Sequence, residues 1–196
     1  MKALTYLTGA LGLILTLFIS SCSKDNQNIK FVSVNQTYSQ TGGDTFDVNG
    51  DGLPDIFFRV YREIDTSING DVNAIDVIGL NGARILSATK SFTIPGFPIG
   101  IPYFVPKPLS KGTTIDASSS TFADTSYIVA DGDVFGVPLN ESDWINADSY
   151  FGFSLQNSGQ THYGWFRINA LSYTSLRVSG FAFDIRPNTG IKAGEE

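Results

Sequence analysis

The chain has 196 residues, of which 13 are basic and 19 are acidic, so its formal net charge is −6 at pH 7. An acidic chain without a lysine or arginine cluster lacks the concentrated positive charge that nucleic-acid phosphates require, so we expect no nucleic-acid partner. Cys22 is the only cysteine, which excludes an intramolecular disulfide and any metal centre built from several thiolates.

The N-terminal segment has the pattern of a secretory signal. A short basic start, residues 1–2, precedes an almost wholly apolar run over residues 3–19, and small residues come before Cys22. A transmembrane anchor is the alternative, but a span needs roughly 20 apolar residues and the chain becomes polar at Ser20. We therefore expect residues 1–21 to be a signal peptide.

The quartet Ile19-Ser20-Ser21-Cys22 resembles the lipobox of bacterial lipoproteins. This resemblance implies that a diacylglyceryl group is attached to the Cys22 thiol and that the signal is cleaved before this residue. The polar run over residues 22–28 is then a flexible tether between the lipid and the domain. The expected location is the cell envelope, at the periplasmic or surface face of an outer membrane, with the lipid as the membrane contact.

Beyond the tether, residues 29–196 are expected to form one domain of short strands joined by turns. The strand-like runs cover residues 29–34, 55–61, 74–80, 83–88, 125–130, 150–156, 161–169 and 175–185. Asn81-Gly82 is the strongest hairpin signal between two of these runs, and no stretch has a helical period with caps at both ends. The predicted fold class is all-β, a jelly-roll-like antiparallel β-sandwich, with an irregular β-barrel as the alternative.

The most informative motif lies between Phe46 and Ile56. Five residues supply oxygen ligands at positions 1, 3, 5, 7 and 9 of a calcium-binding loop, the one at position 7 through its carbonyl: Asp47, Asn49, Asp51, Leu53 and Asp55. Oxygen ligands at alternate positions converge on one hard cation because the loop wraps round it, and Gly52 allows the sharp turn at position 6. We therefore expect a bound Ca²⁺, with Asp44 as a further candidate ligand.

The loop is not an EF-hand, because position 12 is Phe58 instead of glutamate and the flanking residues have the pattern of strands. It resembles the Asp-x-Asp-x-Asp-Gly-x-x-Asp elements of dockerins, thrombospondin type 3 repeats and secreted β-rich proteins. The alternative is an Asx-rich turn that binds nothing. A weaker echo of the motif, in Asp71, Asn73 and Asp76, lacks the glycine.

Two aromatic residues are candidate ligand contacts. Tyr103 lies in a segment, residues 94–108, in which five prolines alternate with aromatic residues. Because proline cannot donate to a strand ladder, this segment is expected to be a loop or a sheet edge, either a ligand-binding lip or a loop that folds over the core. Trp144 is either part of a sugar-stacking platform or a core residue.

The C-terminal part contains Gly152-Phe153, then Gly159-Gln160-Thr161-His162-Tyr163-Gly164-Trp165 and a closing Gly-Ile-Lys-Ala-Gly over residues 190–194. This pattern resembles a group of secreted bacterial proteins that pair an early calcium-type loop with a late GQTHYGW block. The chain departs from the group at Phe183-Asp184, where tyrosine-glutamate is usual. The resemblance implies an extracellular β-sandwich and no particular reaction.

Signals for catalysis are sparse. His162 is the only histidine, so a Ser-His-Asp triad would have to use it, and no nucleophile elbow accompanies it. Glycoside hydrolysis needs paired carboxylates, for which the chain offers Asp131, Asp133, Glu141, Asp143 and Asp148. We expect a non-enzymatic binding or structural protein of the cell surface, with a glycan or protein ligand. The alternative is a lipid-anchored polysaccharide hydrolase.

Overall fold

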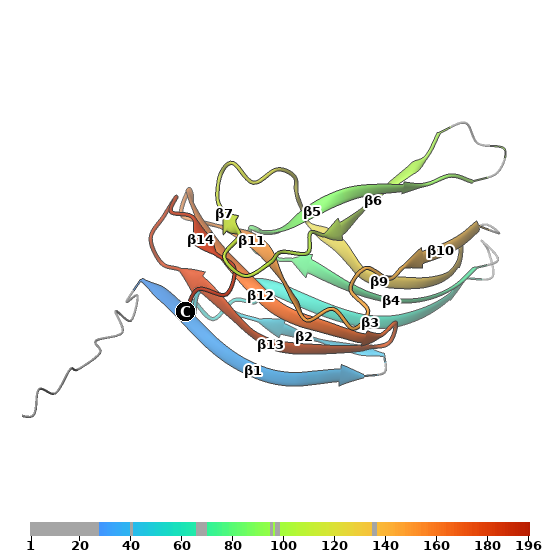
Figure 1. The fold of residues 1–196 in the computed structure, drawn as a ribbon, viewed down its shortest axis with the longest axis horizontal. Helices are drawn as coiled ribbons and strands as arrows, with labels where there is room; N and C mark the ends of the chain where they lie inside the picture. The colour runs from blue at the N-terminus through green and yellow to red at the C-terminus, as the bar shows by residue number, and fades with distance from the viewer. Residues whose placement is uncertain (1–27, 40, 66–69, 95, 97–98, 135–136) are drawn as a thin grey trace, which may run out of the picture.

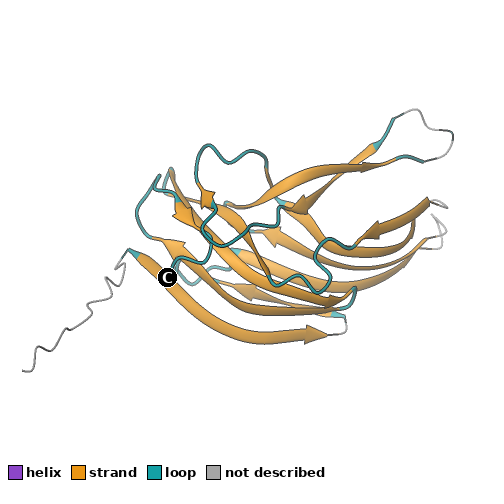
Figure 2. Cartoon of the chain, viewed as in Figure 1, coloured by secondary structure: helices purple, strands orange, loops and turns teal. Residues whose placement is uncertain are grey.

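The structure, a computed structural model, describes residues 28–39, 41–65, 70–94, 96, 99–134 and 137–196. The expected signal peptide, Cys22 and the tether up to residue 27 lie outside the described residues. Strands, turns and loops make up the described part, and none of its residues is helical (Figure 2). Accordingly, it contains no helix that is long and apolar enough to cross a membrane.

The larger sheet has seven strands in the order β1-β13-β12-β11-β5-β6, with β8 paired to β5 (Figure 1). Their bounds are β1 Ile29–Ser39, β13 Ser175–Asp184, β12 Gln160–Ser172, β11 Ser149–Asn157, β5 Ala83–Phe92, β6 Ile101–Pro106 and β8 Phe122–Ala123. All of its strand pairs are antiparallel. Long-range antiparallel pairing therefore joins β1 to β13, the second strand of the β12–β13 hairpin.

The smaller of the two main sheets has five strands in the order β10-β9-β4-β3-β2. Their bounds are β10 Val137–Glu141, β9 Thr125–Val134, β4 Gly70–Gly79, β3 Ile56–Asp65 and β2 Gly42–Phe46. A two-stranded ribbon, β14 (Ile191–Lys192) with β7 (Thr114–Ile115), lies outside both sheets. The described sheets are open, so the all-β antiparallel sandwich is confirmed and the alternative of an irregular barrel is not realised.

The main core lies between the two large sheets. Its largest group is a set of phenylalanine rings contributed by both sheets. Phe151 and Phe166 stack with centroids 5.5 Å apart, and Phe58 of the facing sheet meets Phe166 edge-on at 5.3 Å. Each such side chain contributes roughly 1.5 to 3 kcal/mol by leaving water, so the phenylalanine-rich strands supply the stability that no disulfide provides.

A second apolar cluster covers the outer face of the seven-stranded sheet. It joins Trp165 and Ala182 of the sheet to Ile115 and Ile191 of the β7–β14 ribbon.

In β13 a bulge at Ser179 shifts the register, because Gly180 pairs with Arg167 whereas Val178 pairs with Ile168. The bulge turns residues on both of its sides toward the main core, which is why apolar residues in β13 do not follow a simple alternation.

All eight predicted strands are present, and most are longer than the sequence pattern indicated. Two hairpin turns also match their signals. Asn81 and Gly82 have φ of 46° and 91°, and Ser158 and Gly159 have φ of 51° and 77°. Positive φ at both central residues is what a two-residue type I′ turn requires. The proline-rich segment contains β6, which forms the edge of the larger sheet, as its prolines predicted.

Candidate metal loop and candidate ligand pocket

The Asp47–Asp55 loop is the connection of the β2–β3 hairpin. Phe46 and Ile56 are the last paired residues of the two strands, and the Asp55 N–H donates to the Phe46 carbonyl at 2.8 Å. Val48 points inward from the loop and is 4 % exposed, within the main core. The hairpin register and this apolar anchor together hold both ends of the loop in place.

The polar side chains of the loop accept hydrogen bonds from its own backbone. Asp47 accepts from the N–H of Gly50 at 2.6 Å and of Gly52 at 2.8 Å. Asn49 Oδ1 accepts from the Asp51 N–H, and Asp51 Oδ1 from the Leu53 N–H, both at 2.8 Å. Gly50 and Gly52 have φ of 84° and 89°, values that favour glycine. The alternating oxygen side chains therefore hold the backbone of the loop in a tightly wound form.

Asp55 is the buried member of the loop. It is 1 % exposed, and its Oδ2 accepts the Val48 N–H at 2.9 Å. Burial raises the pKa of the Asp55 carboxyl, the backbone N–H groups of Val48 and Asn49 oppose this shift, and the charges of Asp51 and Asp47 add to it. The ion pairs of the described residues include none to these three carboxylates.

The described residues contain no gathered group of three or more histidine, cysteine, aspartate or glutamate side chains that would by itself hold a metal ion. The loop instead offers three carboxylates and one asparagine amide, whose oxygens are engaged with backbone N–H groups. A carboxylate oxygen has more than one lone pair, and an all-oxygen donor set suits a hard cation such as Ca²⁺. Calcium binding by this loop therefore stays a prediction.

Asp44, the further candidate ligand, is engaged elsewhere. It belongs to β2, opposite Phe58 in the ladder. Its Oδ2 accepts the Tyr38 hydroxyl at 3.0 Å, and its Oδ1 accepts the Thr45 N–H at 2.8 Å. Both carboxylate oxygens thus stabilise the β1–β2 region.

The weaker echo of the motif forms no loop. Its three residues lie in the continuous strand β4, where successive side chains alternate between faces. Asp71 pairs with Arg62 at 2.7 Å, and the buried Asp76 pairs with Arg59 at 2.5 Å. An extended strand cannot wrap round an ion, so these residues do not form the second loop that the missing glycine already disfavoured.

Tyr103 lies in a pocket of about 390 Å³ where β6 passes β9 and β10 of the other sheet. Phe92, Phe104 and Tyr127 contribute the other aromatic rings of its lining. The Tyr103 ring centroid lies 6.3 Å from that of Phe92 and 6.4 Å from that of Tyr127, with the rings tilted against each other. Of these lining residues, the sequence had indicated only Tyr103 as a ligand contact. The others come from strands that lie far apart in the chain, so no sequence pattern groups them with Tyr103.

A buried acid lies behind the pocket. Glu141 is 1 % exposed, and its Oε2 is 2.8 Å from Lys90 Nζ and accepts the Tyr103 hydroxyl at 3.4 Å. Burial of the Lys90 ammonium lowers its pKa, but hydrogen bonds to Asp143 and Glu141 outweigh this, so the net shift is upward. Burial and the nearby Glu141 charge raise the pKa of Tyr103. The network fixes the phenol at the pocket wall.

Trp144, the other candidate ligand contact, is a core residue. It is 0 % exposed, its indole N–H donates to the Pro106 carbonyl at 3.0 Å, and its ring meets Phe151 edge-on at 6.3 Å. The ligand contact expected for Trp144 is therefore corrected: the indole presents no surface to a ligand, because the segment that follows β10 carries it inward.

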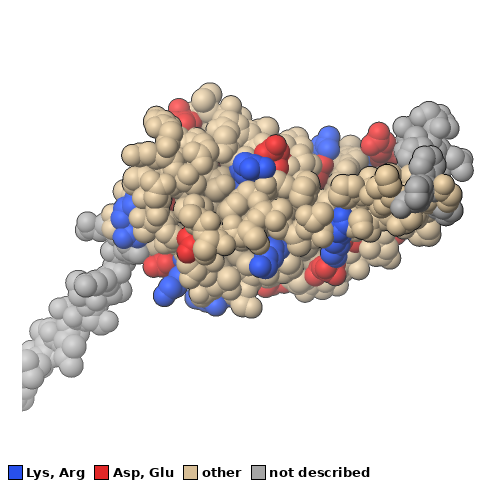
Figure 3. Space-filling model, turned by 90° about the horizontal axis from the view of Figure 1, so that it is seen from above, with Lys and Arg blue, Asp and Glu red and all other residues tan. Residues whose placement is uncertain are grey.

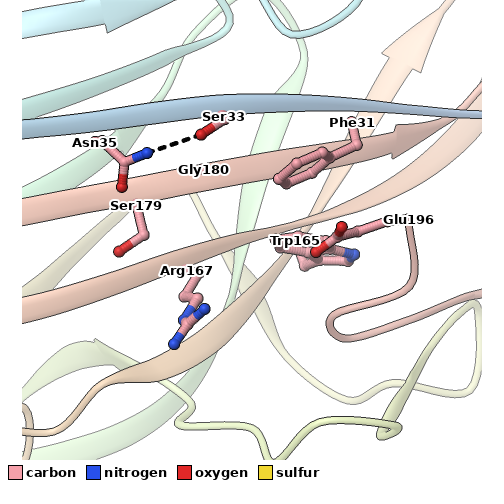
Figure 4. A pocket seen from close by; sticks show the side chains of 8 residues that line it. All are labelled: Phe31, Ser33, Asn35, Trp165, Arg167, Ser179, Gly180 and Glu196. Atoms are coloured by element: carbon pink, nitrogen blue, oxygen red, sulfur yellow. Dashed lines mark hydrogen bonds between the residues drawn. The ribbon is translucent and has the colours of Figure 1, made fainter.

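A second, smaller depression of about 180 Å³ lies on the outer face of β1, β13 and β12. Figure 4 shows Phe31 over Trp165, with Arg167, Ser179 and Glu196 around them. The Phe31 and Trp165 centroids are 5.9 Å apart, and Trp165 is only 1 % exposed. Because its indole is covered, this depression has no open tryptophan face on which a sugar could stack.

The single histidine packs inside the larger sheet. His162 is 8 % exposed, its Nδ1 is 3.1 Å from the Asp184 carbonyl oxygen, and its ring lies 5.3 Å from that of Phe183. Gly164, in the same block, has an equally structural role. A Cβ on this residue would lie 2.1 Å from the Phe153 ring. The GQTHYGW block, residues 159–165, thus forms the end of the β11–β12 turn and the densely packed first part of β12.

The acidic residues considered for hydrolysis are mostly paired with bases. Glu141 and Asp143 share Lys90, and Asp148 pairs with Arg167 at 2.6 Å. Asp131 and Asp133 lie along β9, facing Asn140 and Pro138 of β10 in the ladder. Three of these five acids are therefore engaged in ion pairs.

Comparison with known proteins identifies no relative: no family model, no curated protein and no solved structure matches this chain. Functional inference therefore rests on the loop, the pocket and the residues around them.

Proposed function

We propose that this protein is a lipid-anchored β-sandwich of the cell envelope, stabilised by calcium, that acts as a binding module and not as an enzyme. The observation that carries the calcium part is Asp55, a carboxylate with 1 % exposure at the base of a loop that also holds Asp47 and Asp51. A buried carboxylate that feels the like charges of two neighbouring aspartates is costly unless a cation offsets them.

The placement in the envelope comes from the lipobox-like quartet that ends at Cys22. The lipid would hold the protein at the outer membrane, and the polar run after Cys22 would separate the domain from the bilayer. The surface supports this arrangement, because basic side chains do not gather in one field on the face seen in Figure 3. Electrostatic docking on anionic lipid or nucleic acid is therefore not part of the proposal.

The binding role is preferred over hydrolysis because of the chemistry around the pocket. Its walls are aromatic and apolar, and the nearest acids, Glu141 and Asp143, are both ion-paired with Lys90. A pocket of this volume with few polar groups has the character of a ligand site. Glycoside hydrolysis requires two carboxylates that flank the substrate, whereas these two acids are bridged by one lysine and are not among the described residues that line the pocket.

Calcium-dependent thermal unfolding tests the proposal. The full chain, purified in detergent and stripped with a chelator, would be melted across a calcium titration, with magnesium as comparison. An ion at about 100 times its Kd stabilises a folded protein by about 2.7 kcal/mol, which for a domain of this size corresponds to a rise in Tm of roughly 5 to 10 °C. An unchanged Tm at millimolar calcium would overturn the calcium part.

Two charge-neutralising variants locate the ion. Asp51→Asn keeps an acceptor for the Leu53 N–H but removes one loop charge, and we expect it to weaken calcium binding about tenfold, or roughly 1.4 kcal/mol. Asp148→Asn makes the same change at a surface ion pair with Arg167. The control should keep the full calcium response, and an equal loss in both variants would contradict binding at the loop.

A further inference from the structure

The pocket formed by β6, β9 and β10 has walls with little charge. Its aromatic part consists of Phe92, Tyr103, Phe104 and Tyr127, and its aliphatic part includes Leu139. No charged side chain among the described residues lines it. A charged ligand group would lose its water there without a partner of opposite charge, which is costly. The occupant is therefore neutral.

Hydroxyl groups are the polar part of the lining. They belong to Tyr103, Tyr127 and Thr125, and a hydroxyl both donates and accepts hydrogen bonds. Tyr103 is held in place by Glu141 behind it, and Tyr127 shares a hydrogen bond with Tyr61. Because Tyr103 donates its proton to Glu141, its phenol oxygen is left as an acceptor. Such an acceptor suits a ligand that itself carries hydroxyl groups.

One side of the pocket is open to water. Ile101 and Phe104 at its rim are 39 % and 37 % exposed, so an occupant would keep one face in solvent. An acyl chain or an apolar peptide segment would leave apolar surface exposed on that side. A pyranose ring suits both sides, because its C–H face packs on negatively polarised aromatic faces and its hydroxyls point to water and to the tyrosines.

The location of the pocket agrees with an external ligand. In Figure 1 the β5–β6 arm extends toward the end of the molecule opposite the start of β1, where the chain arrives from its N-terminal segment. The pocket therefore lies away from the end of the domain at which a lipid on Cys22 would be attached.

From these observations we infer that the pocket lined by Tyr103 and Tyr127 binds a neutral saccharide, in the size range of one or two pyranose units. The volume of about 390 Å³ accommodates a ligand of this size. This inference rests on the proposed binding role and adds the class of ligand, and it does not depend on the calcium loop.

Calorimetric titration of the full chain tests the inference. The probes are neutral tetrasaccharides (cellotetraose, xylotetraose, mannotetraose and chitotetraose), tetragalacturonate as an acidic comparison, and palmitate as an apolar one. We expect at least one neutral tetrasaccharide to bind with a Kd below about 1 mM, and tetragalacturonate not to bind. Absence of neutral-sugar binding, or binding of palmitate that Tyr103→Ala abolishes, would overturn the inference.

Variants at the pocket wall make the result specific. Tyr103→Ala should weaken saccharide binding about tenfold or more by removing ring and hydroxyl, and Tyr103→Phe about threefold by removing the hydroxyl alone. Tyr38→Phe is the matched control, because the Tyr38 hydroxyl that it removes contacts Asp44 away from the pocket. This variant should bind as the wild type does. Equal weakening in the control would also overturn the inference.

The calcium titration separates this inference from the proposed function. Saccharide binding without a calcium response would contradict the calcium part of the proposed function and leave the pocket inference standing. A calcium response without binding of any neutral saccharide would contradict the pocket inference and leave the calcium part of the proposed function standing. Tm values of each variant with and without calcium show whether a loss of binding reflects a loss of folding.

Discussion

The Val48 N–H donates a hydrogen bond of 2.9 Å to Asp55 Oδ2 across the base of the β2–β3 loop. Both residues are buried, at 4 % and 1 % exposure, so this bond joins the polar loop to the apolar core. It also keeps the Asp55 carboxylate close to Asp47 and Asp51, whose charges help to raise its pKa. The loop thus places one buried carboxylate near two exposed carboxylates of like charge.

This arrangement predicts opposite pH dependences with and without calcium. The pKa of Asp55 is raised in the folded protein, so its contribution to stability is full below its unfolded pKa of about 4. In chelator that contribution is lost as the pH rises through the folded pKa. In saturating calcium stability should instead rise over the same interval, because the ion binds the ionised carboxylates. Urea unfolding at several pH values measures both.

Asp55→Asn isolates that effect. The amide oxygen can still accept the Val48 N–H, but it carries no charge. In chelator at pH 7 we expect this variant to be at least as stable as the wild type and to have lost the calcium response. A variant clearly less stable than the wild type in chelator at pH 7 would contradict the role of the buried charge.

The Arg59–Asp76 ion pair gives a second prediction. Asp76 is 0 % exposed and Arg59 covers it at 2.5 Å, while the guanidinium lies 4.5 Å from the Tyr61 ring centroid. Arg59→Met would leave a buried carboxylate unpaired and should cost about 3 kcal/mol in urea unfolding. Asp76→Asn should cost less, and the double variant should recover most of the loss. Equal stability of Arg59→Met and wild type would show that Arg59 does not stabilise the buried Asp76 carboxylate.

Gly164 predicts a steric effect within the GQTHYGW block. A Cβ there would lie 2.1 Å from the Phe153 ring and 2.5 Å from the Ala182 carbonyl oxygen. Gly164→Ala should therefore destabilise the protein by about 3 kcal/mol, since the backbone on one side cannot yield. Gly100→Ala is the control, because its nearest atom, Ser91 Cβ, is 3.3 Å away. Similar Tm values for the two variants would show that the hairpin tolerates the extra methyl group.

Cys22 gives the prediction for the anchor. In a bacterial host the full chain should appear in the membrane fraction, with an N-terminal peptide whose mass includes a diacylglyceryl group on Cys22. Cys22→Ser removes the thiol that would carry the lipid and should shift the protein to soluble fractions. Ser23→Ala, next to the expected cleavage point, is a matched control that should stay lipidated. Lipid-free wild-type protein would contradict the anchor.

The strand pattern was readable in the sequence because alternation and turn residues are local features. Asn81-Gly82 and Ser158-Gly159 have the positive φ values of hairpin turns, and the prolines around Tyr103 indicated the edge position of β6. The short strands β2, β7, β8, β10 and β14 lie outside the predicted runs, because strands of two to five residues carry too little alternation to be recognised. Propensity describes a strand well only when local preference and tertiary pairing agree.

The sequence alone established the all-β class, the hairpin turns and the calcium-type spacing of Asp47 to Asp55, because each depends on residues close together in the chain. Tertiary structure decided the burial of Trp144 and Asp55, and it brought Tyr103 of β6 beside Tyr127 of β9. Burial and long-range ring contacts depend on how two sheets pack across a core. That packing joins residues with no fixed spacing in sequence, so no local pattern records it.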